Sequence, residues 1–342
     1  MPLLRLDPVR RRWVITGERP AMPDALDSGE LCPFCPGNEG FTPASIREHK
    51  DANGKWDVRV FHDRAPLFHV EGGLAREGEG LYDRMNALGA HEIVVETNQH
   101  GKTLAELAPE HIACVLEICR DRIRDLKQDP RFRYVSLFKD QGRTRPAREE
   151  HGHSQILAIP VLPTLVEREL DWSLSHFQRK ERCLYCDILY QEIQKGTRIV
   201  DRSQEFVCLC PFASRFPYEI CVLPAEHNSS FERDMASDGR LILLAKFLKM
   251  ALMRVETISD RLRLVLHTEP NITSSNADSD RWKTVRDDYH WHFEIHPEIE
   301  ADTGHFDAES FYYNPIPAED AAVALRAIEV TAEKILPAGK GD

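Results

Sequence analysis

An internal repeat is the feature that most constrains how this chain of 342 residues can fold. Two copies share one order: a CxxC pair, a strand-like run that begins with an aromatic or imidazole ring and ends in histidine, and two alternating histidines. A repeated order of this kind indicates one structural unit used twice. The corresponding segments are 32–35 and 183–186 for CxxC, 91–100 and 218–227 for the strand and its histidine, and 151–155 and 290–294 for the final histidines.

Each copy also carries a helix and a further strand between its two histidine segments. Apolar residues at helical spacing predict helices over 109–127 and 233–257, and β-rich runs follow at 132–138 and 262–267. We therefore expect an α+β fold with antiparallel strands and one long helix in each half. The predicted division is 1–170 and 171–342, and a last helix is expected over 318–335 after Pro317.

Composition narrows the classes of function. Lys and Arg number 44 against 56 Asp and Glu, a net charge of −12, which argues against a nucleic-acid partner. No run of about 18 apolar residues is present, so no membrane helix is expected. The N-terminus has no apolar segment after its charges, so we expect no secretory signal and a cytoplasmic location. An anionic substrate would have to be held by local cations, amides or a metal.

The cysteines and histidines favour metal binding. Nine cysteines are too few for a disulfide scaffold, whereas two CxxC pairs in a chain with 15 histidines are typical of duplicated zinc sites. The alternative is that these histidines are satisfied core residues. We expect two structural zinc ions in the chain. The predicted ligands are Cys32, Cys35, His100 and His151 for the first, and Cys183, Cys186, His227 and His290 for the second.

The two histidine segments also predict polar rows. In a strand, residues i and i+2 face the same side, so His151, His153 and Gln155 should lie together. The second row would hold His290, His292 and Glu294. A buried polar row needs partners.

Together these motifs resemble a known family. The CxxC pairs, the HxHxQ row, Phe138-Lys-Asp-Gln-Gly142 and Tyr289-His-Trp-His-Phe-Glu-Ile295 are similar to those of the galactose-1-phosphate uridylyltransferases. That family belongs to the histidine-triad superfamily, and the resemblance is to the branch that includes plant ADP-glucose phosphorylase. It implies two tandem histidine-triad-like modules, each a half-barrel sheet with a long helix.

The resemblance also implies a mechanism. His153 would attack the α-phosphorus of a nucleotide sugar, and a second sugar 1-phosphate would then take the nucleotide from it. Gln155 would donate a hydrogen bond to a phosphoryl oxygen. Glu294 replaces this glutamine in the second row and would repel phosphate, so only the first half should do chemistry. A homodimer with shared active sites is expected.

Substrate contacts follow from the resemblance too, and several residues depart from the family pattern. The implied substrate-binding residues are Arg19, Asp63, Lys139, Asp140, Gly142, Arg143, Arg145 and Arg148. The lysine and the three loop arginines are the phosphate candidates, and a solvated basic loop is the alternative. Loop 143–150 carries Arg, Pro and Glu where the family has small residues, Asp63 and Asp140 stand where Asn is usual, and 307–310 replaces a Gly-Thr-Gly stretch.

Three functions therefore compete. The leading hypothesis is a zinc-containing enzyme that moves UMP from UDP-glucose to galactose 1-phosphate, with nucleotide sugar and sugar 1-phosphate as its partners. A second is an ADP-glucose phosphorylase or a related ADP-sugar adenylyltransferase. The third is a zinc-stabilised nucleotide-binding protein without turnover, which the altered loop favours.

Overall fold

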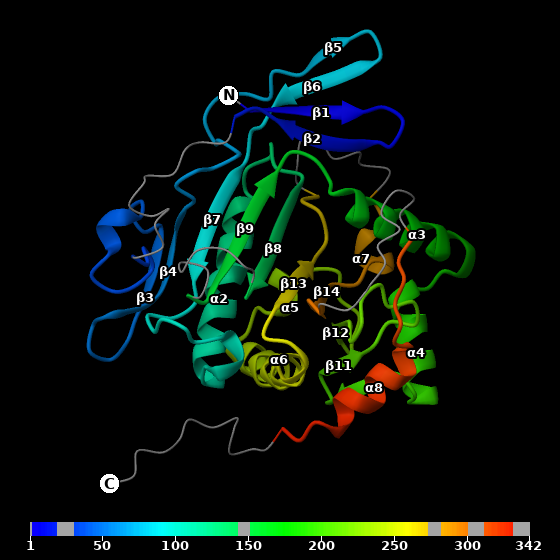
Figure 1. The fold of residues 1–342 in the computed structure, drawn as a ribbon. Helices are drawn as coiled ribbons and strands as arrows, with labels where there is room; N and C mark the ends of the chain where they lie inside the picture. The colour runs from blue at the N-terminus through cyan, green and yellow to red at the C-terminus, as the bar shows by residue number, and fades with distance from the viewer. Residues whose placement is uncertain (1, 19–30, 143–150, 273–281, 300–310, 331–342) are drawn as a thin grey trace.

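The structure is a computed structural model that describes residues 2–18, 31–142, 151–272, 282–299 and 311–330. Within these residues the predicted α+β class is confirmed: antiparallel sheets are combined with several helices (Figure 1). A ten-stranded sheet forms the centre of the molecule, and a four-stranded sheet lies beyond the ends of its strands β8 and β9, at the top of Figure 1.

The large sheet has a strand order that repeats on either side of its centre. β8 and β13 pair there, with Leu137 opposite Leu266. Outward from this pair the order is β9, β7, β4, β3 on one side and β14, β12, β11, β10 on the other. The two parts of the chain therefore build the sheet in the same way. Its strands are β3 (Arg47–Lys50), β4 (Trp56–His62), β7 (Ala90–Val95), β8 (Tyr134–Gln141), β9 (His153–Ile159), β10 (Ile199–Arg202), β11 (Phe206–Leu209), β12 (Ile220–Pro224), β13 (Leu262–His267) and β14 (His292–Pro297).

The small sheet comes from the first 86 residues and was not predicted. Its order is β2-β1-β6-β5, again with antiparallel pairs. The strands are β1 (Leu3–Asp7), β2 (Arg12–Thr16), β5 (Glu77–Glu79) and β6 (Tyr82–Asn86).

Two long helices cover one face of the large sheet and pack against each other (Figure 1). α2 (Pro109–Leu126) confirms the first predicted helix, with Pro109 at its start. The second predicted helix is interrupted: α5 (Phe231–Asp234) ends early, and α6 (Asp238–Ile258) begins after Ser237, whose side chain accepts from the Arg240 amide. A Ser N-cap satisfies a free amide and so starts a new helix.

The remaining helices lie toward the C-terminal half. α8 (Ala318–Ala327) begins where predicted and leaves helical geometry at Ile328. Two helices were not predicted, α3 (Thr164–Lys180) and α4 (Leu184–Lys195). Short turns complete the described chain: α7 (Val285–Asp288), η1 (Glu39–Phe41) and η2 (Leu104–Glu106). None of the described helices is long and apolar enough to cross a membrane.

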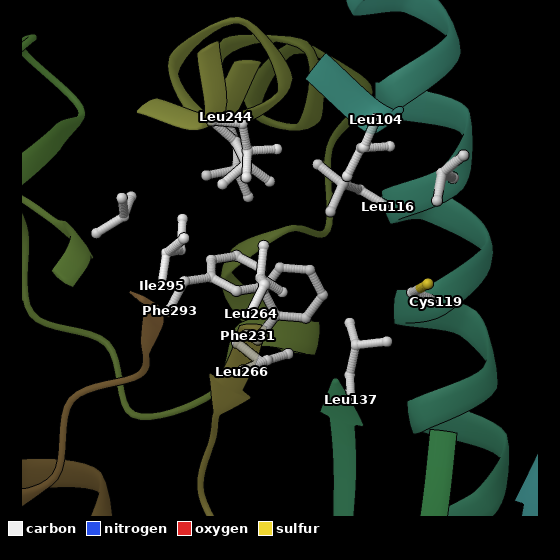
Figure 2. Close-up of a cluster of buried hydrophobic side chains, with 14 of the residues drawn as sticks. Leu104, Leu116, Cys119, Leu137, Phe231, Leu244, Leu264, Leu266, Phe293 and Ile295 are labelled. Carbon is white, nitrogen blue, oxygen red and sulfur yellow. The ribbon is translucent and has the colours of Figure 1, made fainter. Parts of the chain in front are cut away.

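Apolar side chains fill the space between the long helices and the sheet (Figure 2). They come from both parts of the chain, so the halves share one core. The labelled members in Figure 2 are Leu104, Leu116, Cys119, Leu137, Phe231, Leu244, Leu264, Leu266, Phe293 and Ile295.

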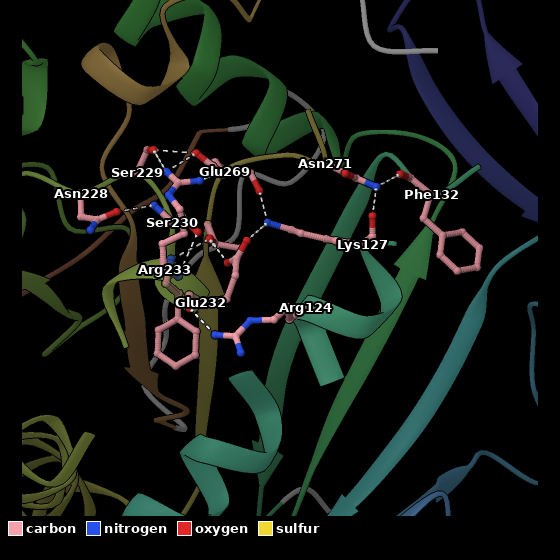
Figure 3. A network of polar contacts seen from close by, with 12 residues as sticks. Arg124, Lys127, Phe132, Asn228, Ser229, Ser230, Glu232, Arg233, Glu269 and Asn271 are labelled. Atoms are coloured by element: carbon pink, nitrogen blue, oxygen red, sulfur yellow. Dashed lines mark hydrogen bonds and ion pairs between the residues drawn. The ribbon is translucent and has the colours of Figure 1, made fainter. Parts of the chain in front are cut away.

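A polar network joins the two parts of the chain at the end of α2 (Figure 3). Lys127 donates to the Glu232 carboxylate at 2.6 Å and to the Glu269 carbonyl at 2.8 Å. The Asn271 amide donates to the carbonyls of Lys127 and Phe132, at 2.8 and 3.0 Å. These bonds satisfy buried groups that the sheet alone would leave unpaired.

The shared core yields a stability prediction. Leu266 is fully buried at the central strand pair, so Leu266→Ala should lower the free energy of unfolding by about 2–5 kcal/mol. Leu81 is 85% exposed, and Leu81→Ala should change it by less than about 0.5 kcal/mol. Urea denaturation of both variants measures this. Equal losses in the two variants would contradict the placement of Leu266 in the core.

Candidate active site and metal centres

The first predicted cysteine–histidine set comes together at one point. The ligand atoms of Cys32, Cys35, His100 and His151 all lie within 4.8 Å of one another. His151 turns Nδ1 toward both sulfurs, at 3.5 and 3.6 Å, and its Nε2 donates to the Thr97 carbonyl at 2.7 Å. A ring that donates from one nitrogen to a carbonyl presents the other to a metal, which is the usual arrangement of a metal-binding histidine. The donor set and its geometry therefore fit a metal ion.

The second predicted set repeats this arrangement. Cys183, Cys186, His227 and His290 also bring their ligand atoms within 4.8 Å of one another. His290 Nε2 faces the Pro224 carbonyl at 3.2 Å, and His227 Nε2 donates to the Arg286 carbonyl at 2.8 Å. Two sulfurs and two imidazoles in a closed group are typical of a structural zinc site.

Each CxxC loop also places an aromatic ring on a histidine. Phe34 packs against His153 with ring centroids 5.2 Å apart, and Tyr185 packs against His292 at 5.1 Å. These rings lie between the paired cysteines, so a metal that holds the cysteines also fixes the wall of the neighbouring site.

His153 is held in one tautomer. Its Nδ1 donates to the His151 carbonyl at 2.9 Å, and within the described part of the chain its Nε2 has no hydrogen-bond partner, so that lone pair can face a substrate. Burial, with the positive charge of Lys139, lowers the pKa of His153, so the neutral ring dominates at pH 7. A neutral imidazole with one free nitrogen can act as a nucleophile.

The polar row is shorter than predicted. β9 begins at His153 and β14 at His292, so His151 and His290 precede the strands and turn into the cysteine clusters. Gly152 allows this turn, because a Cβ there would lie 2.7 Å from the Lys102 carbonyl oxygen.

Gln155 has a partner that sequence reasoning missed. His91 on β7 faces the Gln155 side-chain oxygen at 2.9 Å, and its other ring nitrogen lies 3.0 Å from the Asp63 carboxylate. Burial alone would raise the pKa of Asp63, but the hydrogen bond and charge of His91 lower it. The pairing of β7 with β9 creates this contact, and the sequence does not state that pairing.

Lys139, predicted to bind phosphate, is not brought to this face. Its side chain is 2% exposed and its ammonium pairs with the fully buried Glu96 at 2.8 Å, while Ser154 donates to the same carboxylate. Lys139 lies two residues from Leu137 in β8 and so on the same face, which packs in the helix-covered core, and its side chain points away from His153 and Gln155. The lysine instead supports the backbone, since its ammonium also donates to the His153 carbonyl at 3.3 Å.

Of the other predicted substrate residues, the structure describes Asp140 and Gly142 but not the four arginines. Asp140 lies on the face of Phe138, which pairs with Gln155, and its carboxylate is 3.6 Å from Arg263. Gly142 has φ +70°, and a Cβ there would lie 2.8 Å from the Asp260 carbonyl oxygen, so the backbone alone requires glycine. The remaining candidates, Arg19, Arg143, Arg145 and Arg148, and the stretch 307–310 lie outside the described residues.

The second half carries a different group at the equivalent place. Glu169, His267, His292 and Glu294 bring their ligand atoms within 4.8 Å of one another. Burial would lower the pKa of His267, but the charge of Glu169 raises it to about 9; the charge and hydrogen bond of His267 in turn outweigh burial and hold the pKa of Glu169 at about 2. Arg215 bonds Glu294 at 2.7 Å. The two carboxylates of this group are therefore paired with cationic side chains of the protein itself.

Comparisons with known proteins agree with this geometry. The family model for the N-terminal domain of galactose-1-phosphate uridyl transferase matches residues 5–163. An ADP-glucose phosphorylase from Arabidopsis thaliana is 28% identical, over 96% of this chain and 94% of its own. A galactose-1-phosphate uridylyltransferase from Thermotoga maritima is 26% identical, over 96% and 98%.

Solved structures give the same result. A crystal structure of an ADP-glucose phosphorylase from Arabidopsis thaliana with bound ADP-glucose superimposes with a TM-score of 0.73 at 26% identity, over 96% of this chain and all of that one. A uridylyltransferase mutant gives 0.77 at 25% identity, over 96% and 97%. The chain is therefore similar to solved GalT-like and uridylyltransferase structures. Its resemblance to the galactose-1-phosphate uridylyltransferase family is confirmed by the family model over residues 5–163 and by the Thermotoga maritima relative over 96% of the chain.

The buried pair beneath His153 yields a prediction. Lys139→Met leaves the buried Glu96 side chain without its cationic partner, so the free energy of unfolding should fall by about 3–5 kcal/mol. Lys102–Glu106 is an exposed pair, and Lys102→Met should cost less than about 1 kcal/mol. Urea denaturation compares the two, and adding Glu96→Gln to Lys139→Met should restore part of the loss. A fall below about 1 kcal/mol for Lys139→Met would show that the pair is not buried.

Proposed function

We propose that the chain is a nucleotidyltransferase that moves UMP from UDP-glucose to galactose 1-phosphate through a covalent intermediate on His153. The single observation that carries this proposal is the His153 ring, whose Nδ1 donates to the His151 carbonyl while no described residue bonds its Nε2. The matches to galactose-1-phosphate uridylyltransferases support the choice of uridine nucleotide and galactose 1-phosphate.

The reaction follows from the chemistry of the residues. Nε2 of His153 attacks the α-phosphorus, the P–N bond forms, and the bond to the glucose 1-phosphate oxygen breaks. A phosphate oxygen of galactose 1-phosphate then attacks the same phosphorus, and the P–N bond breaks. Both leaving and entering phosphates are already ionised, so neither step needs a strong general base. The enzyme contributes position and hydrogen bonds to the phosphoryl oxygens, with Gln155 as the donor beside His153.

A second candidate is an ADP-glucose phosphorylase, which differs in the base and in the acceptor. The Arabidopsis relative and its structure with bound ADP-glucose favour it. The third candidate is a protein that binds nucleotide without turnover. It is favoured by the sequence of loop 143–150, which carries Arg, Pro and Glu.

We further propose that each cysteine–histidine cluster holds a structural zinc ion, two per chain. Such ions would hold the CxxC loops and the rings of Phe34 and Tyr185 against the sheet. The proposed division into modules remains 1–170 and 171–342, each histidine-triad-like. The proposed protein is a homodimer located in the cytoplasm. It binds neither nucleic acid nor membranes.

Labelling tests the transfer. Incubation with UDP-glucose or ADP-glucose carrying ³²P at the α-position should leave acid-labile, alkali-stable label on the protein, and the base of the labelled donor distinguishes the first two candidates. His153→Ala should reduce the label to background, whereas His292→Asn, at the matching position of the second half, should keep it. Binding of nucleotide without label would favour the third reading. Label that persists in His153→Ala would overturn the assignment of the nucleophile.

Metal analysis tests the clusters. Metal-replete protein should contain about two zinc ions per chain, and Cys183→Ser about one, because each closed site needs its four ligands. Chelation should also lower the melting temperature, since metal binding contributes to folding free energy. Ser173→Ala, at a buried serine outside both clusters, serves as a control that keeps both ions. Metal-replete protein with no zinc would refute the prediction.

A further inference from the structure

A chain of three side chains leads away from the candidate nucleophile on the open face of the sheet. Asp63 follows β4, His91 lies on β7 and Gln155 on β9, three strands that neighbour one another in the sheet. His91 Nδ1 is 3.0 Å from an Asp63 oxygen, and His91 Nε2 is 2.9 Å from the Gln155 oxygen. The side chains of His91 and Asp63 are only 13% and 20% exposed, so water competes weakly for these bonds.

The direction of the bonds sets the direction of the amide. An ionised carboxylate only accepts, so His91 Nδ1 carries a hydrogen toward Asp63. His91 Nε2 lies 2.9 Å from the Gln155 side-chain oxygen, and an amide oxygen only accepts, so this contact leaves the amide NH₂ turned away from His91. Among the described residues no acceptor is bonded to that NH₂. With the amide reversed, its oxygen would face the phosphate and repel it.

We propose that His91, held by Asp63, is a positioning residue that fixes the Gln155 amide with its N–H groups toward the phosphoryl oxygens of the substrate. This inference rests on the proposed function and deepens it. Asp63 then acts inside the protein, on His91, because its carboxylate lies 3.0 Å from the ring nitrogen that faces away from Gln155. The substrate role expected for Asp63 from the resemblance is replaced by this one.

The second half lacks this chain of bonds. The position 127 residues after His91 is Tyr218, which has φ +58°, and the equivalent of Gln155 is Glu294, held by Arg215 and His267. A carboxylate held by cations cannot donate to phosphate. The three-residue chain is therefore found, within the described residues, only in the half that carries His153.

A double-mutant cycle tests the proposal. His91→Phe keeps a ring and removes both donors, and it should slow single-turnover nucleotidylation of His153 by about 10–100-fold. The Kd of the nucleotide sugar should change by less than about 3-fold, because the amide acts on the reacting phosphoryl group. In a Gln155→Ala background, His91→Phe should slow the reaction by less than about 3-fold, since the group that it positions is gone.

Conservative variants provide the matched controls. His91→Gln can still donate to Gln155 and should recover part of the rate, whereas Asp63→Leu should resemble His91→Phe and add little to it. Equal losses from His91→Phe in both backgrounds would overturn the proposal. A loss of nucleotide affinity with an unchanged rate would overturn it too, because His91 would then contact the nucleotide.

A measurement without turnover separates this inference from the proposed function. The side-chain amide signals of Gln155 in a ¹H–¹⁵N NMR spectrum, assigned with Gln155→Ala, should shift or broaden in His91→Phe and in Asp63→Leu. Unchanged signals would refute the positioning role even if the wild-type protein is labelled on His153. Absence of label in the wild type, with shifted amide signals, would refute only the proposed transfer and leave the contact established.

Discussion

The hydrogen bond from His153 to the His151 carbonyl joins the first cysteine–histidine cluster to the candidate nucleophile. His151 turns its ring into the first cysteine–histidine cluster, and its carbonyl sets the tautomer of the residue two positions later. Phe34, between the paired cysteines, packs on the same ring. A shift in the cluster would therefore move the carbonyl and the aromatic wall together. A metal held in this cluster would therefore set the position of the His153 ring without contacting it.

The cysteine–histidine clusters could be predicted because residues that are widely spaced in the chain share an uncommon chemistry. Four residues of Cys and His type, in one order and repeated, leave few other uses. Lys139 was misplaced for a different reason. Its position in the strand, two residues from the core residue Leu137, was readable from the alternation of side chains and already pointed it toward the helices. The resemblance to the uridylyltransferase family took precedence over that alternation.

The contacts of Gln155 could not be read from sequence. The neighbouring polar residue, Glu92, pairs with Arg122 instead. Neither the spacing nor the type of these two residues indicates which of them reaches Gln155. Only the pairing of β7 with β9 brings His91 to Gln155. The missed helix α3 has a related cause: Val166, Leu170 and Ser173 are its buried positions, so its apolar stripe is too thin for a periodicity argument. In both cases tertiary structure supplied the information.

Duplication explains the differences between the halves as well as their likeness. Both place the second histidine of an HxH motif at the start of a strand, with its Nδ1 on the preceding histidine's carbonyl, at 2.9 and 3.1 Å. They differ in charge. The first half keeps a neutral amide beside a partly buried ring, whereas the second buries two carboxylates around His292 and balances them with His267 and Arg215. The carboxylates of the second half are already neutralised by that half's own residues, so an anion binding there would have to break ion pairs, whereas beside His153 the corresponding residue is an uncharged amide.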